Sequence, residues 1–136
     1  MTHPPAMANE MRINSQVLGI GFLFTLKFLS GIWLTRSGKP YNAVILAVHK
    51  IISLLTVVLI AVAVRRWGRG VGMGAVEIGA IVVTGVLFLL TILSGGLLST
   101  DRPTQAAILV VHRATPFLTV LSTAVTIYLV LQWAPQ

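Results

Sequence analysis

The sequence contains no cysteine among its 136 residues, so disulfides, thiolate metal sites and cysteine nucleophiles are excluded. Acidic residues are almost as scarce, because Glu10, Glu77 and Asp101 are the only three. The sequence offers no carboxylate pair, no nucleophile beside a base and no phosphate-binding loop. Independent catalysis is therefore not expected, and any part in an enzyme would be that of an oxidoreductase subunit.

Charged residues of both signs make up only 10% of the chain, whereas 56% is apolar. A soluble domain of this size needs more charge to cover its surface, so the composition indicates an integral membrane protein. Four apolar segments reach the length of about 20 residues that crosses a bilayer as a helix. We therefore predict an all-α, four-helix membrane bundle in one transmembrane domain, 1–136. The helices are expected at about 13–35, from 41–43 to the arginine cluster at 65–69, at 75–99 and at 104–132.

The first 12 residues include two prolines and few apolar side chains, which predicts a mobile tail. His3 lies in this tail and is given no role. Asn14 and Ser15 are candidate caps for the first helix.

The net charge is +7, which in a soluble protein would suggest a nucleic-acid partner. Here the cations lie in short loops and at helix ends, where anionic lipid headgroups and the positive-inside rule account for them, and no nucleic acid is expected. Arginines cluster at 65–69 on the side of the termini, against Arg36, Lys39 and Arg102 on the other side. This predicts cytoplasmic termini in a bacterial inner membrane.

One stretch occurs twice, at 43–57 (AVILAVHKIISLLTV) and again 63 positions later at 106–120 (AAILVVHRATPFLTV). Any two membrane helices share apolar residues, but a histidine followed by a cation is rarely repeated at one place. Matches at an offset of 64 extend to the first and third helices. We therefore predict a tandem duplication of a helix hairpin, with repeat one at about 13–69 and repeat two at about 75–136. A pseudo-two-fold axis should run along the membrane normal.

The repeated histidines, His49 and His112, each lie about seven residues into a helix, which places them roughly 10 Å below its start. Lys27 is expected in the same layer of the membrane. The sequence supplies no acid at that depth, and burying an ammonium group costs at least a few kcal/mol. Lys27 should therefore either snorkel or meet a carboxylate or phosphate of a ligand.

Two imidazoles at equal depth on equivalent helices suggest a shared metal. Neutral imidazole is a good axial ligand for haem iron, whereas tetrahedral zinc would need more protein ligands. We predict one haem b bound axially by His49 and His112. Cations would meet its propionates, and glycines would let the ring lie against the backbone: Lys27, Lys50, Arg113, Gly31 and Gly95.

The helix HKIISLLTVVLIAVAVRRW, beginning at His49, resembles the His-Lys helix of small membrane b-type cytochromes, which are four-helix bundles with bis-histidine haem. The resemblance implies that His49 and His112 are axial ligands. Many such proteins bind two haems through four histidines. This chain has two membrane histidines, which limits it to one haem and implies a further redox partner.

Two other functions stay open. The chain could be a cofactor-free accessory subunit whose histidines form interhelical hydrogen bonds, or a small carrier of lipid or anions. Ser-Gly pairs can serve close helix packing, and Lys50 and Arg113 can snorkel to the headgroups. The expected partners are the bilayer, quinone as an electron partner, and other membrane subunits or further copies of this chain.

Overall fold

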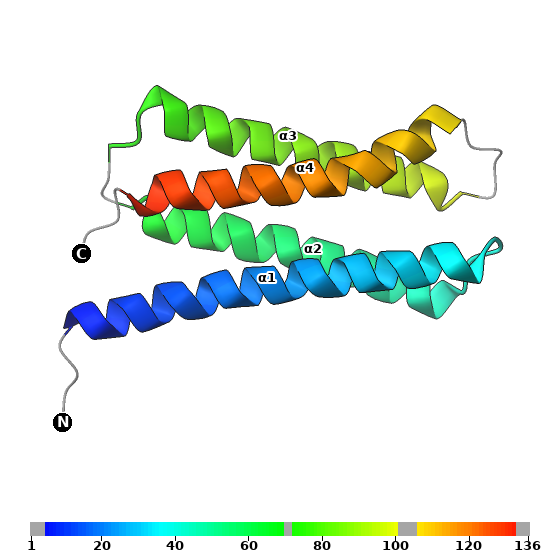
Figure 1. Cartoon of the computed structure of the whole chain (residues 1–136), viewed down its shortest axis with the longest axis horizontal. Helices are drawn as coiled ribbons and strands as arrows, with labels where there is room; N and C mark the ends of the chain where they lie inside the picture. The colour runs from blue at the N-terminus through cyan, green and yellow to red at the C-terminus, as the bar shows by residue number, and fades with distance from the viewer. Residues whose placement is uncertain (1–4, 70–71, 101–105, 133–136) are drawn as a thin grey trace. The chain divides into compact units, whose positions relative to one another are not determined.

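The structure is a computed structural model, and it describes residues 5–69, 72–100 and 106–132. It contains four helices, α1 (Pro5–Ser37), α2 (Ala43–Trp67), α3 (Ala75–Leu98) and α4 (Ala106–Leu131). Each is long and apolar enough to cross a membrane. The predicted class, an all-α membrane protein with four spanning helices, is confirmed (Figure 1).

The chain divides into two compact units, and the boundary between them in the sequence falls between Arg66 and Trp67, at the end of α2. Hairpin 1 consists of α1 and α2, and hairpin 2 consists of α3 and α4. Figure 1 shows that the two helices of each hairpin run antiparallel. Each predicted repeat thus forms a compact unit, and the prediction that both belong to one transmembrane domain stays a prediction.

The first helix begins at Pro5 and not near residue 13, so the prediction of a mobile tail is wrong for residues 5–12. Proline is well suited to the first turn of a helix, where its missing N–H has no partner to lose. Ser15 is not a cap, because it lies inside α1 and its hydroxyl donates to the carbonyl of Arg12 (2.8 Å). Asn14 is equally internal. The rest of the predicted tail, residues 1–4 with His3, lies outside the described residues.

Helix α1 ends at Ser37, and Gly38 follows with φ at +70°. Only glycine adopts this left-handed conformation without strain, which makes it the usual residue just past a helix end. The turn that leads into α2 is therefore specified locally. Asn42 then caps α2, because its side-chain oxygen accepts hydrogen bonds from the backbone N–H groups of Val44 and Ile45.

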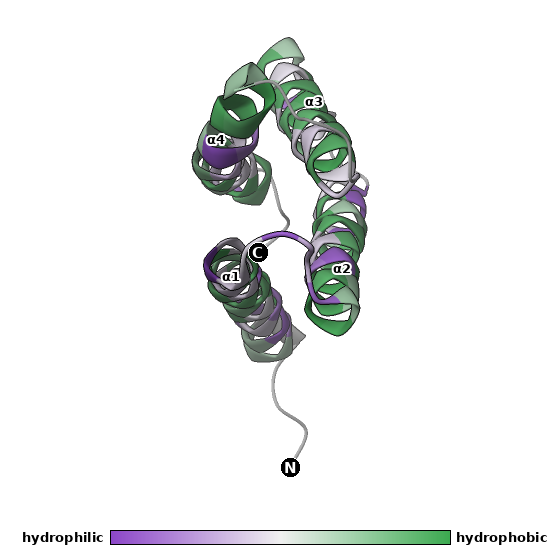
Figure 2. Ribbon diagram, turned by 90° about the vertical axis from the view of Figure 1, so that its right-hand side faces the viewer, coloured by the Kyte–Doolittle hydropathy of each residue, from purple (hydrophilic) through white to green (hydrophobic). Residues whose placement is uncertain are grey.

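The helices of hairpin 2 expose large apolar side chains and bury mostly small polar ones. In hairpin 2, leucines such as Leu89, Leu93 and Leu121 are exposed. Most of the buried residues there carry hydroxyls: Thr84, Thr91, Ser94, Thr115, Thr119, Thr123 and Thr126. Figure 2 shows hydrophobic residues along all four helices. This distribution is typical of helices that meet lipid outside and each other through small residues inside.

The buried positions repeat with the same offsets as the sequence. In α1 and α3 the equivalent buried pairs, 64 positions apart, are Ile20 and Thr84, Phe24 and Phe88, Lys27 and Thr91, and Ser30 and Ser94. In α2 and α4 the pairs, 63 positions apart, are Thr56 and Thr119, Ile60 and Thr123, Ala63 and Thr126, and Trp67 and Val130. The duplicated hairpin is therefore visible in burial as well as in sequence.

Candidate functional site

The histidine of hairpin 1 bridges its two helices. His49 is the seventh residue of α2 and half-buried, and its Nδ1 lies 2.9 Å from the hydroxyl of Ser30 in α1. Its ring lies against Gly31, where an added Cβ would come 3.2 Å from Cε1. A serine and the glycine after it thus hold one imidazole.

Hairpin 2 repeats this arrangement with the same residue types. His112 is the seventh residue of α4, and its Nδ1 lies 3.1 Å from the hydroxyl of Ser94 in α3. An added Cβ at Gly95 would come 2.8 Å from Cε1 of the ring. We call each set a Ser-Gly-His cluster: Ser30, Gly31 and His49 in hairpin 1, and Ser94, Gly95 and His112 in hairpin 2.

Each of the two predicted glycines lies beside the histidine of its own hairpin. Gly31 and Gly95 were expected to let a macrocycle lie against the backbone. The imidazole of the same hairpin lies there, closer to Gly95 than to Gly31, and contact of the glycines with a cofactor stays a prediction. A Cβ at Gly95 would collide with the ring and one at Gly31 would crowd it, so both glycines allow the histidine its close approach.

The backbone differs at the two histidines because α4 contains Pro116. Proline has no N–H, so it cannot donate to the carbonyl four residues earlier, which belongs to His112. The equivalent residue of α2 is Ser53, whose hydroxyl donates to the carbonyl of His49 (2.8 Å). Figure 1 shows α4 bending between its orange and yellow parts, as expected for a helix with an internal proline.

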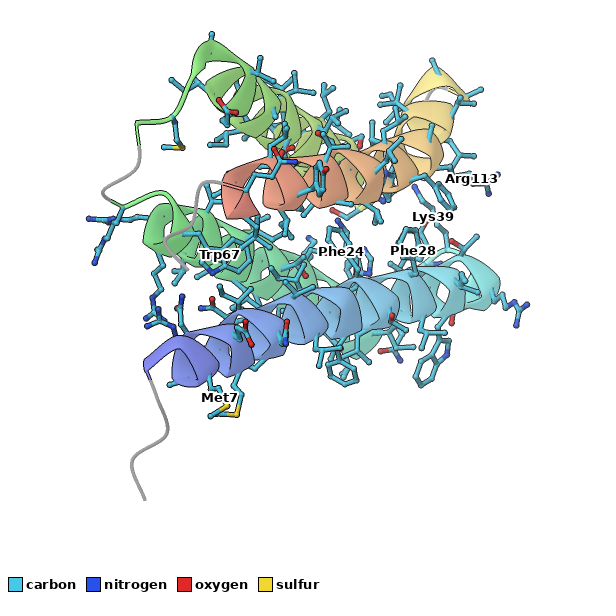
Figure 3. The ribbon with its side chains drawn as sticks, turned by 60° about the vertical axis from the view of Figure 1, so that its left-hand side comes forward. Met7, Phe24, Phe28, Lys39, Trp67 and Arg113 are labelled. Atoms are coloured by element: carbon cyan, nitrogen blue, oxygen red, sulfur yellow. The ribbon has the colours of Figure 1, made fainter. Side chains whose placement is uncertain are left out.

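Lys27 is buried at 5% exposure, and its Nζ lies 6.0 Å from the ring centroid of Phe24. Phe24 is almost one turn earlier in α1, away from the turn that follows Ser37. The side chain therefore does not snorkel to that surface, which had been one of the two expectations. Figure 3 shows Phe24 and Phe28 on the same side of α1. The cation thus stays at membrane depth beside an aromatic ring, a contact that favours it.

The other two cations predicted to meet propionates are exposed. Lys50 and Arg113 directly follow the histidines, so they point about 100° away around their helices. Figure 3 shows Arg113 projecting outward from the start of α4. Neither belongs to a Ser-Gly-His cluster, and their contact with a cofactor stays a prediction.

Hairpin 2 also contains a series of hydrogen-bonded hydroxyls that joins α3 and α4. Thr126 donates to the carbonyl of Ala80 (3.2 Å). The hydroxyl of Thr84 is hydrogen-bonded to those of Thr126 (2.9 Å) and Ser122 (2.6 Å), and either atom of each pair could be the donor. The equivalent residues of hairpin 1 are Ile20, Leu59 and Ala63, which cannot form such a chain. The duplicated halves have thus diverged in how their helices are joined.

If these hydroxyls hold α3 and α4 together, removing the central one should lower the stability of hairpin 2. Thr84→Val removes both hydrogen bonds of the central hydroxyl while it keeps the shape of the side chain. Interhelical hydrogen bonds in membranes contribute about 0.6 kcal/mol on average and up to about 1.7 kcal/mol. We expect hairpin 2 to lose about 1–2 kcal/mol of unfolding free energy, measured by denaturant titration in mixed micelles.

Thr25→Val is the matched control, because the exposed hydroxyl of Thr25 donates only to the carbonyl of Gly21 in its own helix (3.0 Å). The control should change the unfolding free energy by less than about 0.5 kcal/mol. Equal effects of the two variants would show that the hydroxyl chain does not hold α3 and α4 together.

Comparison of the chain with protein families, with curated proteins and with solved structures found no match. Among the described residues, no group of three or more histidine or acidic side chains that could hold a metal ion is found. The candidate site therefore rests on the two clusters themselves.

The sequence had singled out both histidines and both glycines but had missed Ser30 and Ser94 as their hydrogen-bond partners. The repeat carried the signal, because each serine recurs together with its histidine.

Proposed function

We propose that the chain is a haem-binding electron-transfer subunit of a membrane, with one haem b ligated by His49 and His112. The observation that supports this most is the duplicated Ser-Gly-His cluster. A histidine that ligates a metal needs a second group to fix the orientation of its ring, usually through the other ring nitrogen. Each half of the chain supplies such a histidine and such a group.

The donor chemistry fits haem better than other metals. Two imidazoles satisfy the two axial positions of haem iron, whereas a structural zinc site needs four protein ligands. A bound haem would supply one-electron redox chemistry, which the side chains of this protein lack. The buried ammonium of Lys27 and the exposed cations Lys50 and Arg113 are the candidates to meet its propionates.

The proposed setting is a bacterial inner membrane with the termini in the cytoplasm. The exposed arginines at the end of α2, Arg65, Arg66 and Arg69, support this orientation through the positive-inside rule. A single haem does not connect the two membrane surfaces, so the protein would exchange electrons with a partner. A quinone in the bilayer, another membrane subunit or a second copy of this chain would serve.

The test is the visible spectrum of the protein purified in detergent. We expect a Soret band, a reduced-minus-oxidised difference spectrum of a six-coordinate b-type cytochrome, and about one haem per chain. A ratio near one haem per two chains would indicate that two copies share the cofactor. A colourless protein with full helix content that does not bind added hemin would refute the proposal.

A second candidate function, a cofactor-free accessory subunit, is favoured by the same hydrogen bonds. Each Ser–His contact joins two helices of a hairpin and would stabilise it without any ligand. The hemin titration separates the two candidates, because only a haem protein shows saturable binding with an imidazole-ligated spectrum.

A further inference from the structure

We infer that Ser30 and Ser94 hold His49 and His112 as the Nδ1–H tautomer, which makes Nε2 the ring atom offered to a metal. The two serines are thus positioning residues. The tautomer of the two histidines is inferred from the hydrogen bonds alone. The binding of haem iron through Nε2 rests on the proposed function.

The argument begins with the single hydrogen of a serine hydroxyl. A backbone carbonyl can only accept, so Ser30 donates this hydrogen to the carbonyl of Lys27, one turn earlier in α1 (3.0 Å). The hydroxyl then has only lone pairs left for His49, whose Nδ1 lies 2.9 Å away. Both contacts of the hydroxyl are satisfied together only when the hydrogen between these atoms is on Nδ1, and this is the arrangement we infer.

The same reasoning holds in hairpin 2. Ser94 donates to the carbonyl of Leu90, which is close at 2.6 Å, with that of Thr91 at 3.2 Å as the other acceptor on the same helix. Either choice uses its only hydrogen. The contact with His112 is satisfied alongside it only when Nδ1 donates to the serine oxygen, across 3.1 Å.

The consequence for coordination follows from imidazole chemistry. A neutral imidazole with its hydrogen on Nδ1 carries its basic lone pair on Nε2. An acceptor at Nδ1–H also raises the basicity of the ligand and fixes the ring against rotation. Gly31 and Gly95 add to this because the absence of a Cβ lets the ring approach the neighbouring helix closely. Both hairpins thus prepare the same atom of the same residue for a metal.

The tautomer can be measured on the haem-free protein by ¹⁵N NMR with labelled histidine in detergent micelles. We expect both membrane histidines to be protonated at Nδ1 near neutral pH. Ser30→Ala should change the tautomer population of His49 and leave His112 as it is, and Ser94→Ala should do the reverse. Each variant thus contains its own control in the other hairpin.

Two further variants guard against indirect effects. Ser30→Thr keeps a hydroxyl and should keep the Nδ1–H tautomer, so it serves as the rescue. Ser15→Ala removes an exposed hydroxyl that bonds only within α1, and should affect neither histidine. Helix content by circular dichroism confirms that each variant is folded.

A hemin titration then tests the link to coordination. Loss of a second-shell partner typically weakens metal binding about 10- to 100-fold, and we expect this range for Ser30→Ala and for Ser94→Ala. Histidines protonated at Nε2 in the original protein, or tautomers that ignore the alanine substitutions, would overturn the inference. Tautomers as expected in a protein that binds no hemin would overturn the proposed function and leave the tautomer inference standing.

Discussion

His49→Gln and His112→Gln should each abolish the bis-imidazole haem spectrum, while His3→Gln should leave it unchanged. The reason is that iron with one imidazole left is five-coordinate or binds a weak sixth ligand, either of which changes the spectrum. Glutamine is the substitute of choice because its amide can still form a hydrogen bond with Ser30 or Ser94. The hairpin contact is thereby kept while the metal ligand is lost.

The measurement is the reduced-minus-oxidised spectrum of each variant, together with its haem content and its helix content. We expect His49→Gln and His112→Gln each to bind hemin at least tenfold more weakly, with helix content unchanged. His3 is the third histidine of the sequence and provides the matched control. If either variant kept a six-coordinate spectrum, that histidine would not be an axial ligand.

Gly95→Ala should be the most damaging glycine substitution in the described part of the chain. The new Cβ would lie 2.8 Å from Cε1 and 3.3 Å from Nδ1 of His112, too close for either atom to stay in place. The ring is held at Ser94 and cannot move far without breaking that bond. Overpacking of this kind typically costs 1–3 kcal/mol, and we expect a loss of about 2 kcal/mol in unfolding free energy along with weaker hemin binding.

Alanine substitutions at two other glycines should have smaller effects and serve as controls. Gly31→Ala brings its Cβ 3.2 Å from Cε1 of His49, a contact that a small shift can relieve, so we expect at most about 1 kcal/mol. Gly85 is on the same helix as Gly95, but a Cβ added there has no atom within 4 Å. Gly85→Ala should therefore be neutral, or stabilising because alanine has a higher helix propensity than glycine. A Gly95→Ala variant as stable as Gly85→Ala would mean that His112 does not lie against α3.

The four spanning helices were predictable because their signal is local. A run of apolar residues of bilayer length forms a helix wherever it is placed, since its backbone groups must bond internally in lipid. The ends of α2, α3 and α4 accordingly lie within a few residues of their predicted positions. The start of α1 was missed because prolines were taken as tail residues, although Pro5 is compatible with a first helical turn.

The candidate site was predictable in part because it was duplicated. Repetition marked His49 and His112 against an apolar background, and it marked Ser30 and Ser94 as well. The sequence did not predict that these serines face the histidines, because that contact depends on the antiparallel register of α1 with α2 and of α3 with α4. The hydroxyl chain of Thr84 was hidden for the same reason, since threonine in a membrane helix commonly bonds within its own helix.

The sequence by itself determined the class, the membrane setting, the hairpin repeat and the two histidines, because these follow from composition, run length and offset along one chain. Only the tertiary structure decided which atom of each ring is engaged, that imidazole lies against Gly31 and Gly95, and that Lys27 stays buried beside Phe24. These features depend on distances of a few ångströms between helices. Such distances are set when two helices pack together, and the residue pattern of one helix does not specify them.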